Sequence, residues 1–478
     1  MTTMSENRDI PVSGGRPDGT GDQWSAGAGR PLPPPASGSQ DRSASQPPAA
    51  SGPASGPSRE APPDPGTTPG LPPAGGTRAV TDPPPVPVPP VTGPTGADVE
   101  LIRRTLAEIQ PVADKVTGHF YALLFLRNPE LRDLFPAAMD TQRDRLFGAL
   151  LTAARHAGDP AALTAYLSDL GRGHRKYGTR AEHYPAVGEC LIGALTRYAH
   201  HTWSPAAETA WVRAYTLISQ IMIDAAAEDE QRSPAWWQAE IVSHELRTPD
   251  TVVLRLRPDK PYPFRAGQYT SVETPWWPRV WRHYSFAGAP SADGTLTFHV
   301  KAVPAGWVSG ALVHRARPGD VLRLGPPAGN MIVDHSTDNG LLCLGGGTGI
   351  APIKALVEDV AEYGRRRLVD VFYGARTDQD LYDLETMLRL ERTHPWLSVH
   401  PVVGDGCPVR AAGLTGQVPD AILGAGSWTG YDGYVSGPPG MIRSGVHALR
   451  RAGIPPDRIR HDSFETISDL QAPALAGE

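Results

Sequence analysis

Apolar residues recur at spacings of three and four along residues 98–230, a pattern that predicts helices. The stripe is clear in LIRRTLAEIQPVADKVTGHFYALLF and returns in DRLFGALLTAARHA, AALTAYLSDLGRGHRKY and WVRAYTLISQIMIDAAAEDE. Prolines fall near the expected helix starts or between stripes, where a missing N–H costs least: Pro129, Pro136, Pro160, Pro185 and Pro205. The pattern predicts an all-α domain, and by itself it suits a globin or a plain helical bundle equally well.

After a linker around residues 231–238, the pattern changes to short strand-like runs. These are AEIVSHELRT, TVVLRLRP, QYTSVET, TLTFHVKAV and DVLRLGPP, with Pro and Gly turns between them. They predict a small antiparallel β-barrel domain over residues 236–338. Further on, apolar strands alternate with helical stretches, which predicts an α/β domain with a parallel sheet over residues 339–475.

The first part of the chain lacks such patterns. Residues 1–96 are dominated by Pro, Gly, Ser and Ala and hold few large apolar residues, so we expect a disordered tail. A flexible spacer is the simplest interpretation of this tail, and docking to a Pro-recognising partner is the alternative. A chain of 478 residues exceeds what one hydrophobic core usually serves. We therefore expect three folded domains, the first of which is helical and covers residues 97–232.

Charge and cysteine content narrow the function classes. A formal net charge of -6 gives no basic footprint for nucleic acid, so we expect no nucleic-acid partner. The sequence contains no stretch of about 18 uninterrupted apolar residues, so it predicts no membrane-spanning helix. The first residues lack the apolar core of a secretion signal. Cys190, Cys343 and Cys407 lie far apart and form no CxxC pair, which argues against structural zinc and iron–sulphur clusters. We expect a cytoplasmic protein.

A glycine-rich turn stands between a predicted strand and a predicted helix in LLCLGGGTGIAPIKALVEDV. Such a turn presents backbone N–H groups and the positive end of the helix dipole to a pyrophosphate. A glycine cluster alone is poor evidence, but this strand–turn–helix context is the one that the motif needs. The candidate NAD(P)-binding residues here are Gly345, Gly346, Gly347, Thr348 and Gly349.

Two stretches of the helical segment, HFYALLFLRNPELRDLF and GHRKYGTRAEHYPAVGECLIGAL, resemble the globin half of bacterial flavohaemoglobins. The resemblance runs in register over roughly the whole segment. It implies a haem b site in which His174 is the proximal iron ligand and Phe135 packs on the haem face. It also implies a distal pocket of Tyr121, Gln142 and Leu146. A lone histidine in a helical domain is more often a surface or core residue, so this assignment depends on the resemblance.

The same resemblance implies that Tyr184 and Glu228 support the proximal His174. A carboxylate hydrogen-bonded to the imidazole makes the ring a stronger donor to iron and favours oxygen activation. Tyr184 as ordinary core and Glu228 as a charged helix end are the simpler interpretations of each residue taken alone. Tyr121 would hydrogen-bond bound oxygen, with ordinary core packing as its alternative. Many relatives carry Lys just before the proximal histidine, where this chain has Gly173.

In the barrel segment, RHYSFAG resembles the flavin-binding signature of the ferredoxin-reductase superfamily. A guanidinium suits phosphate and a phenol suits stacking on a flat ring. GQY upstream and GWVS downstream fit the same family, although each taken alone is consistent with a mere turn. Phe464, in the C-terminal HDSFE, either shields the flavin or is a core residue of a terminal strand. The candidate FAD-binding residues are Tyr269, Arg282, Tyr284, Ser285, Gly306, Val308, Ser309 and Phe464.

The stretch SGPPGM resembles the loop beside the nicotinamide in the same reductases. It adds Ser436, Gly437 and Pro438 to the candidate NAD(P) site, with Ser436 where most relatives have Cys. The sequence shows no obvious Ser-Arg pair that would bind the 2′-phosphate of NADPH, so NADH is the expected reductant. Arg376 leaves NADPH as an alternative.

Together the segments resemble a flavohaemoglobin, which implies that electrons pass from NAD(P)H through FAD to haem. Flavin is needed because nicotinamide gives two electrons at once whereas haem accepts one. The expected activity is that of a nitric oxide dioxygenase, which forms nitrate from nitric oxide and oxygen as its small-molecule substrates. The alternatives are an NADH oxidase or peroxide-type oxidoreductase, and a gas or redox sensor whose tail recruits a partner.

Overall fold

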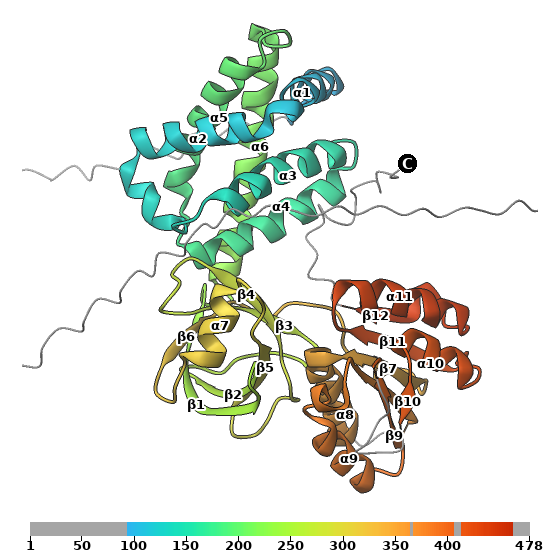
Figure 1. Ribbon diagram of the computed structural model, residues 1–478. Helices are drawn as coiled ribbons and strands as arrows, with labels where there is room; N and C mark the ends of the chain where they lie inside the picture. Colours follow the sequence, from blue (N-terminus) through green and yellow to red (C-terminus); the bar gives the residue numbers. More distant parts are fainter. Residues whose placement is uncertain (1–92, 364–366, 406–412, 462–478) are drawn as a thin grey trace, which may run out of the picture. The chain divides into compact units, whose positions relative to one another are not determined.

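The computed structural model describes residues 93–363, 367–405 and 413–461 (Figure 1). All of them fall within one compact unit of the chain. Most of the predicted tail, up to residue 92, lies outside the described residues, and so does Phe464. Among the helices of the described part, none combines the length and the apolar character that a membrane span needs.

The first domain is all-α, as the periodicity predicts. Asp159 and Ser204 cap the N-termini of two helices by accepting hydrogen bonds from backbone N–H groups, and Pro160 and Pro205 occupy the first helical positions. The helices are α1 (Gly96–Ile109), α2 (Ala113–Arg127), α3 (Asp140–His156), α4 (Pro160–His174), α5 (Tyr184–Tyr198) and α6 (Pro205–Glu230). Short 3₁₀ turns join them at Gln110–Val112, Pro129–Leu134, Arg175–Tyr177 and Ala181–His183.

Helices α4 and α6 approach each other very closely. A Cβ atom at Gly171 of α4 would lie 2.3 Å from the carbonyl oxygen of Met222 in α6, so only glycine fits there. The main core of the domain lies between α1, α2, α5 and α6, with Leu124 and Leu195 fully buried in it. The contact at Gly171 fixes the position of the last turn of α4, where His174 stands.

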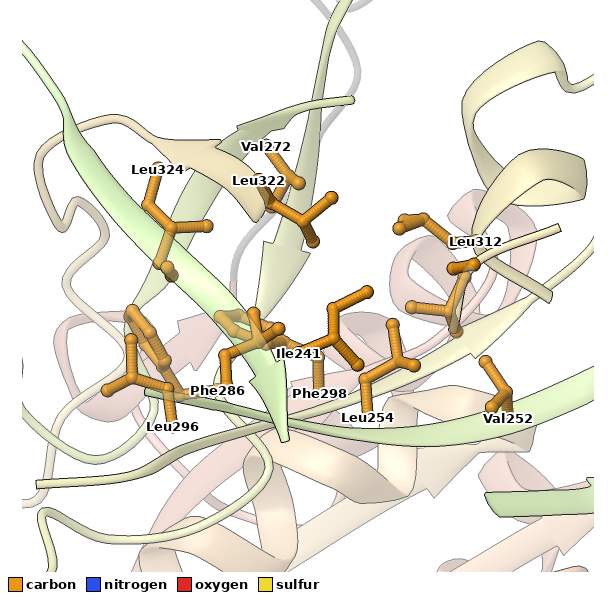
Figure 2. Close-up of a cluster of buried hydrophobic side chains, with 14 of the residues drawn as sticks. Ile241, Val252, Leu254, Val272, Phe286, Leu296, Phe298, Leu312, Leu322 and Leu324 are labelled. Atoms are coloured by element: carbon orange, nitrogen blue, oxygen red, sulfur yellow. The ribbon is translucent and has the colours of Figure 1, made fainter. Parts of the chain in front are cut away.

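The second domain is the predicted antiparallel barrel. Its strands are β1 (Trp237–Thr248), β2 (Thr251–Pro258), β3 (Tyr269–Glu273), β4 (Trp281–Ser285), β5 (Leu296–Lys301) and β6 (Val321–Leu324). They are arranged in the order β4-β3-β6-β1-β2-β5, and an antiparallel bridge from Phe286 to Phe298 joins the two outer strands. Figure 2 shows the side chains that fill the interior, among them Ile241, Leu254 and Leu324. Helix α7 (Trp307–His314) covers this core through Val308 and Leu312.

The third domain holds a six-stranded parallel sheet in the order β10-β9-β8-β7-β11-β12. Its strands are β7 (Gly340–Gly346), β8 (Val369–Ala375), β9 (Leu397–Val403), β10 (Leu414–Thr415), β11 (Tyr431–Ser436) and β12 (Ile459–His461). In Figure 1, α8 (Ile350–Tyr363) and α9 (Leu384–Thr393) cover one face, while α10 (Val418–Gly424) and α11 (Pro439–Arg451) cover the other. The strand order reverses between β7 and β11, which is where nucleotides bind in such sheets.

Candidate haem, flavin and nicotinamide sites

A cavity of about 440 Å³ lies inside the helical domain and has mostly apolar walls. The candidate haem residues converge on it from four helices and one connecting segment. Tyr121 comes from α2, Gln142 and Leu146 from α3, His174 from α4 and Tyr184 from α5. Phe135, which follows the 3₁₀ turn after α2, lines the same cavity. The structure therefore brings together six of the seven residues that the sequence suggested for this site.

His174 is the strongest candidate ligand in this cavity. Its Nδ1 lies 2.6 Å from the carbonyl oxygen of Leu170, one turn earlier in α4. Donation of the Nδ1 proton to this carbonyl leaves the lone pair on Nε2, at the far side of the ring. Burial lowers the pKa of His174 from its ordinary value, so the imidazole stays neutral. A neutral imidazole with a free Nε2 is the axial donor that haem iron requires.

The distal candidates line the same cavity from α2 and α3. The hydroxyl of Tyr121 donates to the backbone carbonyl of Gln142 at 3.2 Å, and burial raises the pKa of this phenol. Its ring meets Phe135 edge to face, with centroids 5.6 Å apart. Tyr121 is therefore protonated and held at the cavity wall, where its hydroxyl is already directed at a backbone acceptor.

Glu228 does not reach His174, in contrast to the expected proximal triad. Its carboxylate lies on the exposed face of α6 and pairs with Arg232 one turn later. Met222 of α6 lines the cavity, and six further residues rotate the helix by about 240°, which turns position 228 away from it. Among the described contacts, the support of His174 comes from the Leu170 carbonyl rather than from a carboxylate.

Tyr184, the other expected member of that triad, does line the cavity. Burial raises the pKa of its phenol to about 12, so the hydroxyl remains protonated. Its backbone carbonyl accepts a hydrogen bond from the hydroxyl of Tyr215 at 2.7 Å, which ties the start of α5 to α6.

In the barrel, strand pairing brings the separate flavin signatures together. Strands β3 and β4 run antiparallel with Tyr269 opposite Ser285, so the GQY and RHYS stretches lie side by side. Arg282 is exposed, and its guanidinium is anchored by donating to the carbonyl of Trp281 at 2.9 Å. Tyr284 packs against the barrel core, and burial raises its pKa. An exposed guanidinium beside a half-buried phenol suits a phosphate and a flat ring, respectively.

The GWVS stretch forms the start of α7. A Cβ at Gly306 would lie 2.4 Å from the Ser309 Oγ, so the turn has room only for glycine. The Ser309 hydroxyl donates to the Gly306 carbonyl at 3.3 Å and stabilises this turn from inside, while Val308 is buried in the barrel core. Gly306 offers no side-chain cap, which leaves the first N–H groups of α7 open to phosphate oxygens.

The two glycine-rich loops of the α/β domain meet at the carboxyl ends of β7 and β11. Gly345 pairs with Ser436 across these strands. A Cβ at Gly349 would lie 2.2 Å from the Ser436 carbonyl oxygen, and one at Gly346 would lie 2.1 Å from the sulphur of Met441. Gly347 has a φ of 55°, a left-handed conformation that favours glycine. The remaining loop candidates, Thr348, Gly437 and Pro438, belong to the same two loops.

Arg376 directly follows β8, so it stands at the same edge of the sheet. Its backbone carbonyl accepts from the N–H of Asp405, which lies beyond β9, at 2.7 Å. The structure thus brings the glycine loops, Ser436 and Arg376 to the carboxyl edge of one parallel sheet, the edge at which dinucleotides bind.

Comparison with known proteins agrees with this order of sites. Family models match in three places: Globin at residues 118–222, Oxidoreductase FAD-binding domain at 238–332 and Oxidoreductase NAD-binding domain at 343–447. A flavohemoprotein of Chromobacterium violaceum is 29% identical over 394 residues, which cover 76% of this chain and 96% of the relative. The flavohemoprotein of Bacillus subtilis is 26% identical and covers 77% and 96%. The chain belongs to the flavohaemoglobin family.

Solved structures and partial relatives refine this membership. The crystal structure of the flavohaemoglobin from Malassezia yamatoensis with bound FAD and haem has the same fold, with a TM-score of 0.65 and 19% identity. It matches 78% of this chain and 100% of its own. The reductase half is also similar to the ferredoxin–NAD(P)⁺ reductase component of the naphthalene 1,2-dioxygenase system of Pseudomonas putida, at 33% identity. That match covers 47% of this chain and 67% of the relative.

This flavohaemoglobin is an oxidoreductase that uses haem, FAD and NAD(P)H. The residues present fit each group. The mostly apolar cavity offers the Nε2 of His174, the barrel offers an exposed guanidinium beside an uncapped helix start, and the sheet edge offers tight glycine loops. When bound, flavin accepts hydride and releases single electrons, and haem supplies an iron centre for small gases such as oxygen.

Lys176 is a cavity residue of this flavohaemoglobin that the sequence pattern did not reveal. Its Nζ donates to Ser271 Oγ of the barrel at 3.1 Å and lies 5.3 Å from the Trp281 ring centre. Burial lowers the pKa of Lys176 to about 8, with the positive Arg145 as a further cause. Its position two residues after the expected ligand was the available signal. Gly173, directly before His174, lines the cavity as well.

The residue between them, Arg175, links the end of α4 to the end of α6. Its guanidinium pairs with Asp229 and donates to the backbone carbonyl of Ser233 at 2.7 Å. The side chain is largely buried, at 9% exposed, so this ion pair is shielded from water. Arg175 therefore fixes the segment that follows His174 against the linker that enters the barrel.

Proposed function

We propose that this flavohaemoglobin is a nitric oxide dioxygenase, which converts nitric oxide and oxygen to nitrate at the expense of NAD(P)H. The observation that carries the proposal is the cavity itself. It places the imidazole of His174 on one wall and the hydroxyl of Tyr121 on another, in a chain that also holds both nucleotide sites. Each hydride supplies the electrons for two turnovers, so nicotinamide, oxygen and nitric oxide balance as nitrate, oxidised nicotinamide and one proton.

Each side chain has a separate task in this proposal. His174 would hold haem iron through Nε2 while the Leu170 carbonyl keeps the proton on Nδ1. The neutral O–H of Tyr121 would leave the Gln142 carbonyl, to which it donates in this structure, and donate instead to a small polar ligand in the mostly apolar cavity. Arg282 and the open N–H groups of α7 bind flavin phosphates, and the loops at Gly349 and Ser436 position the nicotinamide nucleotide.

The test is the fate of nitric oxide. The purified holoenzyme, supplied with NADH and oxygen, should consume nitric oxide and form nitrate in a one-to-one ratio. Tyr121→Phe should lower this rate by about 100-fold or more, since it removes one hydrogen-bond donor at the reacting ligand. Oxidation of NADH without nitrate would contradict the proposal.

A second candidate is an NADH oxidase that reduces oxygen to peroxide. The observation that favours it is the partner of His174 Nδ1, which is a backbone carbonyl rather than a carboxylate. A carboxylate there would make the imidazole a stronger donor to iron and promote oxygen activation, and the carbonyl does so less. Peroxide that forms in stoichiometric amount with oxidised NADH, in the absence of nitric oxide, would identify this activity. Peroxide that disappears once nitric oxide is added, with nitrate in its place, would return the assignment to the dioxygenase.

We further propose NADH as the preferred reductant, with Arg376 as the residue that would otherwise favour NADPH. The ratio of kcat/KM for the two nucleotides tests this preference. Arg376→Ala should lower the value for NADPH more than that for NADH, because only NADPH carries a 2′-phosphate. Equal losses for the two nucleotides would exclude Arg376 from this role.

A further inference from the structure

Two tryptophans form an exposed stack on the barrel domain. The rings of Trp277 and Trp307 have centroids 5.0 Å apart and an angle of 22° between their planes. They retain 37% and 47% of their surface in contact with solvent, which is unusual for the largest apolar side chain. Exposed apolar surface of this kind usually marks a place where a ligand or partner binds.

The pair adjoins the flavin signatures on both sides. Trp307 directly follows Gly306 and is the first residue of α7, so it stands at the proposed phosphate turn. Trp277 belongs to the connection between β3 and β4, four residues before the strand that carries Arg282 and Tyr284. The stack is therefore built from the two segments that would hold the pyrophosphate of FAD.

Packing explains why the two rings remain outside the core. Val308 and Leu312 of α7 face the barrel interior, whereas Trp307 begins the helix on its solvent side. Neighbouring Trp276 differs, since it packs on the core and lies under Arg315, 5.1 Å from the ring centre.

We propose that Trp277 and Trp307 form the platform on which the adenine ring of FAD stacks. FAD extends beyond its pyrophosphate into an adenosine whose base needs a flat apolar surface, and an indole face supplies one. The platform adds affinity for FAD over FMN, which ends at the first phosphate. It acts on cofactor binding, so its test is independent of the reaction that the haem performs.

The experiment measures flavin affinity in the full-length protein, stripped of flavin but retaining haem. FAD and FMN are titrated separately, and bound flavin is followed by the change in its fluorescence. Trp307→Ala should raise the Kd for FAD roughly 5- to 150-fold, the range that corresponds to base–aromatic stacking energies. The Kd for FMN should change by less than about 2-fold, because FMN has no base to stack.

Matched variants separate stacking from damage to the fold. Tyr363, at the end of α8, is a comparable control because it is 61% exposed and stacks on His335 at 3.8 Å. Tyr363→Ala should leave both affinities unchanged. Trp307→Phe keeps an aromatic face and should retain part of the preference for FAD. Trp277→Ala tests the second ring without a change in α7.

The outcomes divide cleanly. A loss confined to FAD, in either Trp307→Ala or Trp277→Ala, supports the platform. Equal losses for FAD and FMN would assign the tryptophans to the fold of the phosphate turn, and unchanged affinities would place adenine elsewhere. Both results overturn the proposal. If Trp307→Ala does not fold, the comparison of FAD with FMN in Trp277→Ala decides the question in the same way.

Discussion

Two histidines in this molecule, His174 and His299, occupy interior positions with quite different surroundings. Burial lowers the pKa of both imidazoles, and each uses Nδ1 in a short contact: His174 with the Leu170 carbonyl and His299 with the Tyr382 hydroxyl at 2.8 Å. The free Nε2 of His174 has a cavity of about 440 Å³ before it. That of His299 is enclosed and has no hydrogen-bond partner among the described residues. The space in front of the nitrogen, rather than burial or basicity, separates a ligand site from a packed one.

The surroundings of His299 show what a packed histidine does. It stands on β5 of the barrel, and Tyr382 and Asp383 lie just before α9 of the α/β domain. One Asp383 carboxylate oxygen lies 4.0 Å from His299 Nδ1 and 4.0 Å from the ammonium of Lys354 in α8. The cluster thus joins two domains through polar groups that are almost wholly buried.

Removal of the His174 imidazole should have the largest effect. His174→Ala should weaken haem retention by more than about 100-fold, since even the groups that merely orient metal ligands are worth 10- to 100-fold. Haem content per chain after purification measures the loss, and bound flavin provides the internal control. His299→Gln should keep full haem content. A His174→Ala protein with an unchanged haem spectrum would show that another residue binds the iron.

Loss of the Tyr382 hydroxyl should have the next largest effect. Tyr382→Phe leaves His299 Nδ1 without its partner in a buried place, which costs about 1–3 kcal/mol of unfolding free energy. Thermal release of FAD, followed by fluorescence, reports the stability of the reductase half, whereas the haem spectrum should not change. Unaltered stability would mean that water or a rearranged Asp383 replaces the hydroxyl.

Lowering the pH should reduce the stability of the reductase half through His299. Burial and the positive Lys354 and Arg247 hold the pKa of His299 well below 6.5. Below pH 6.5, His299 therefore binds a proton in the unfolded chain but not in the folded chain. Stability falls there by up to about 1.4 kcal/mol per pH unit and is unaffected by this group above that pH. His299→Gln should flatten the slope of FAD release against pH, and an unchanged slope would contradict this.

The smallest effect concerns Glu228. Because its carboxylate pairs with Arg232 at the surface, Glu228→Gln should change stability by less than about 0.5 kcal/mol. The iron–imidazole stretching frequency of the reduced haem should stay the same. A shift in that frequency would restore Glu228 to the proximal side and would mean that α6 ends differently in the holoprotein.

Much of the architecture was predictable because it depends on local patterns. The period of 3.6 along residues 98–230 specifies helices, and the glycines of GGGTGIAP specify a strand–turn–helix unit wherever they stand. The cavity residues were predictable through their resemblance to a family. From spacing alone, His174 would have been no better a ligand candidate than His299.

The rest depends on contacts between distant segments. Glu228 pairs with Arg232 on the exposed side of α6, and the side that the end of this helix turns toward the cavity depends on packing that no stripe of apolar residues specifies. Lys176 and Ser271 are 95 residues apart, and Trp277 and Trp307 belong to separate segments. Only the folded chain shows that these residues meet.

The Arg175 anchor has a consequence for how this protein can be recombined. The last helix of the helical domain, α6, ends at Glu230, which would be the natural point at which to exchange the reductase. Yet Arg175, the residue after His174, donates a hydrogen bond to the carbonyl of Ser233, which lies three residues beyond Glu230. A chimaera joined at residue 230 would keep every globin helix and still alter the chain beside the iron ligand. A junction between Ser233 and Trp237 preserves both modules, so the functional boundary lies beyond the last helix.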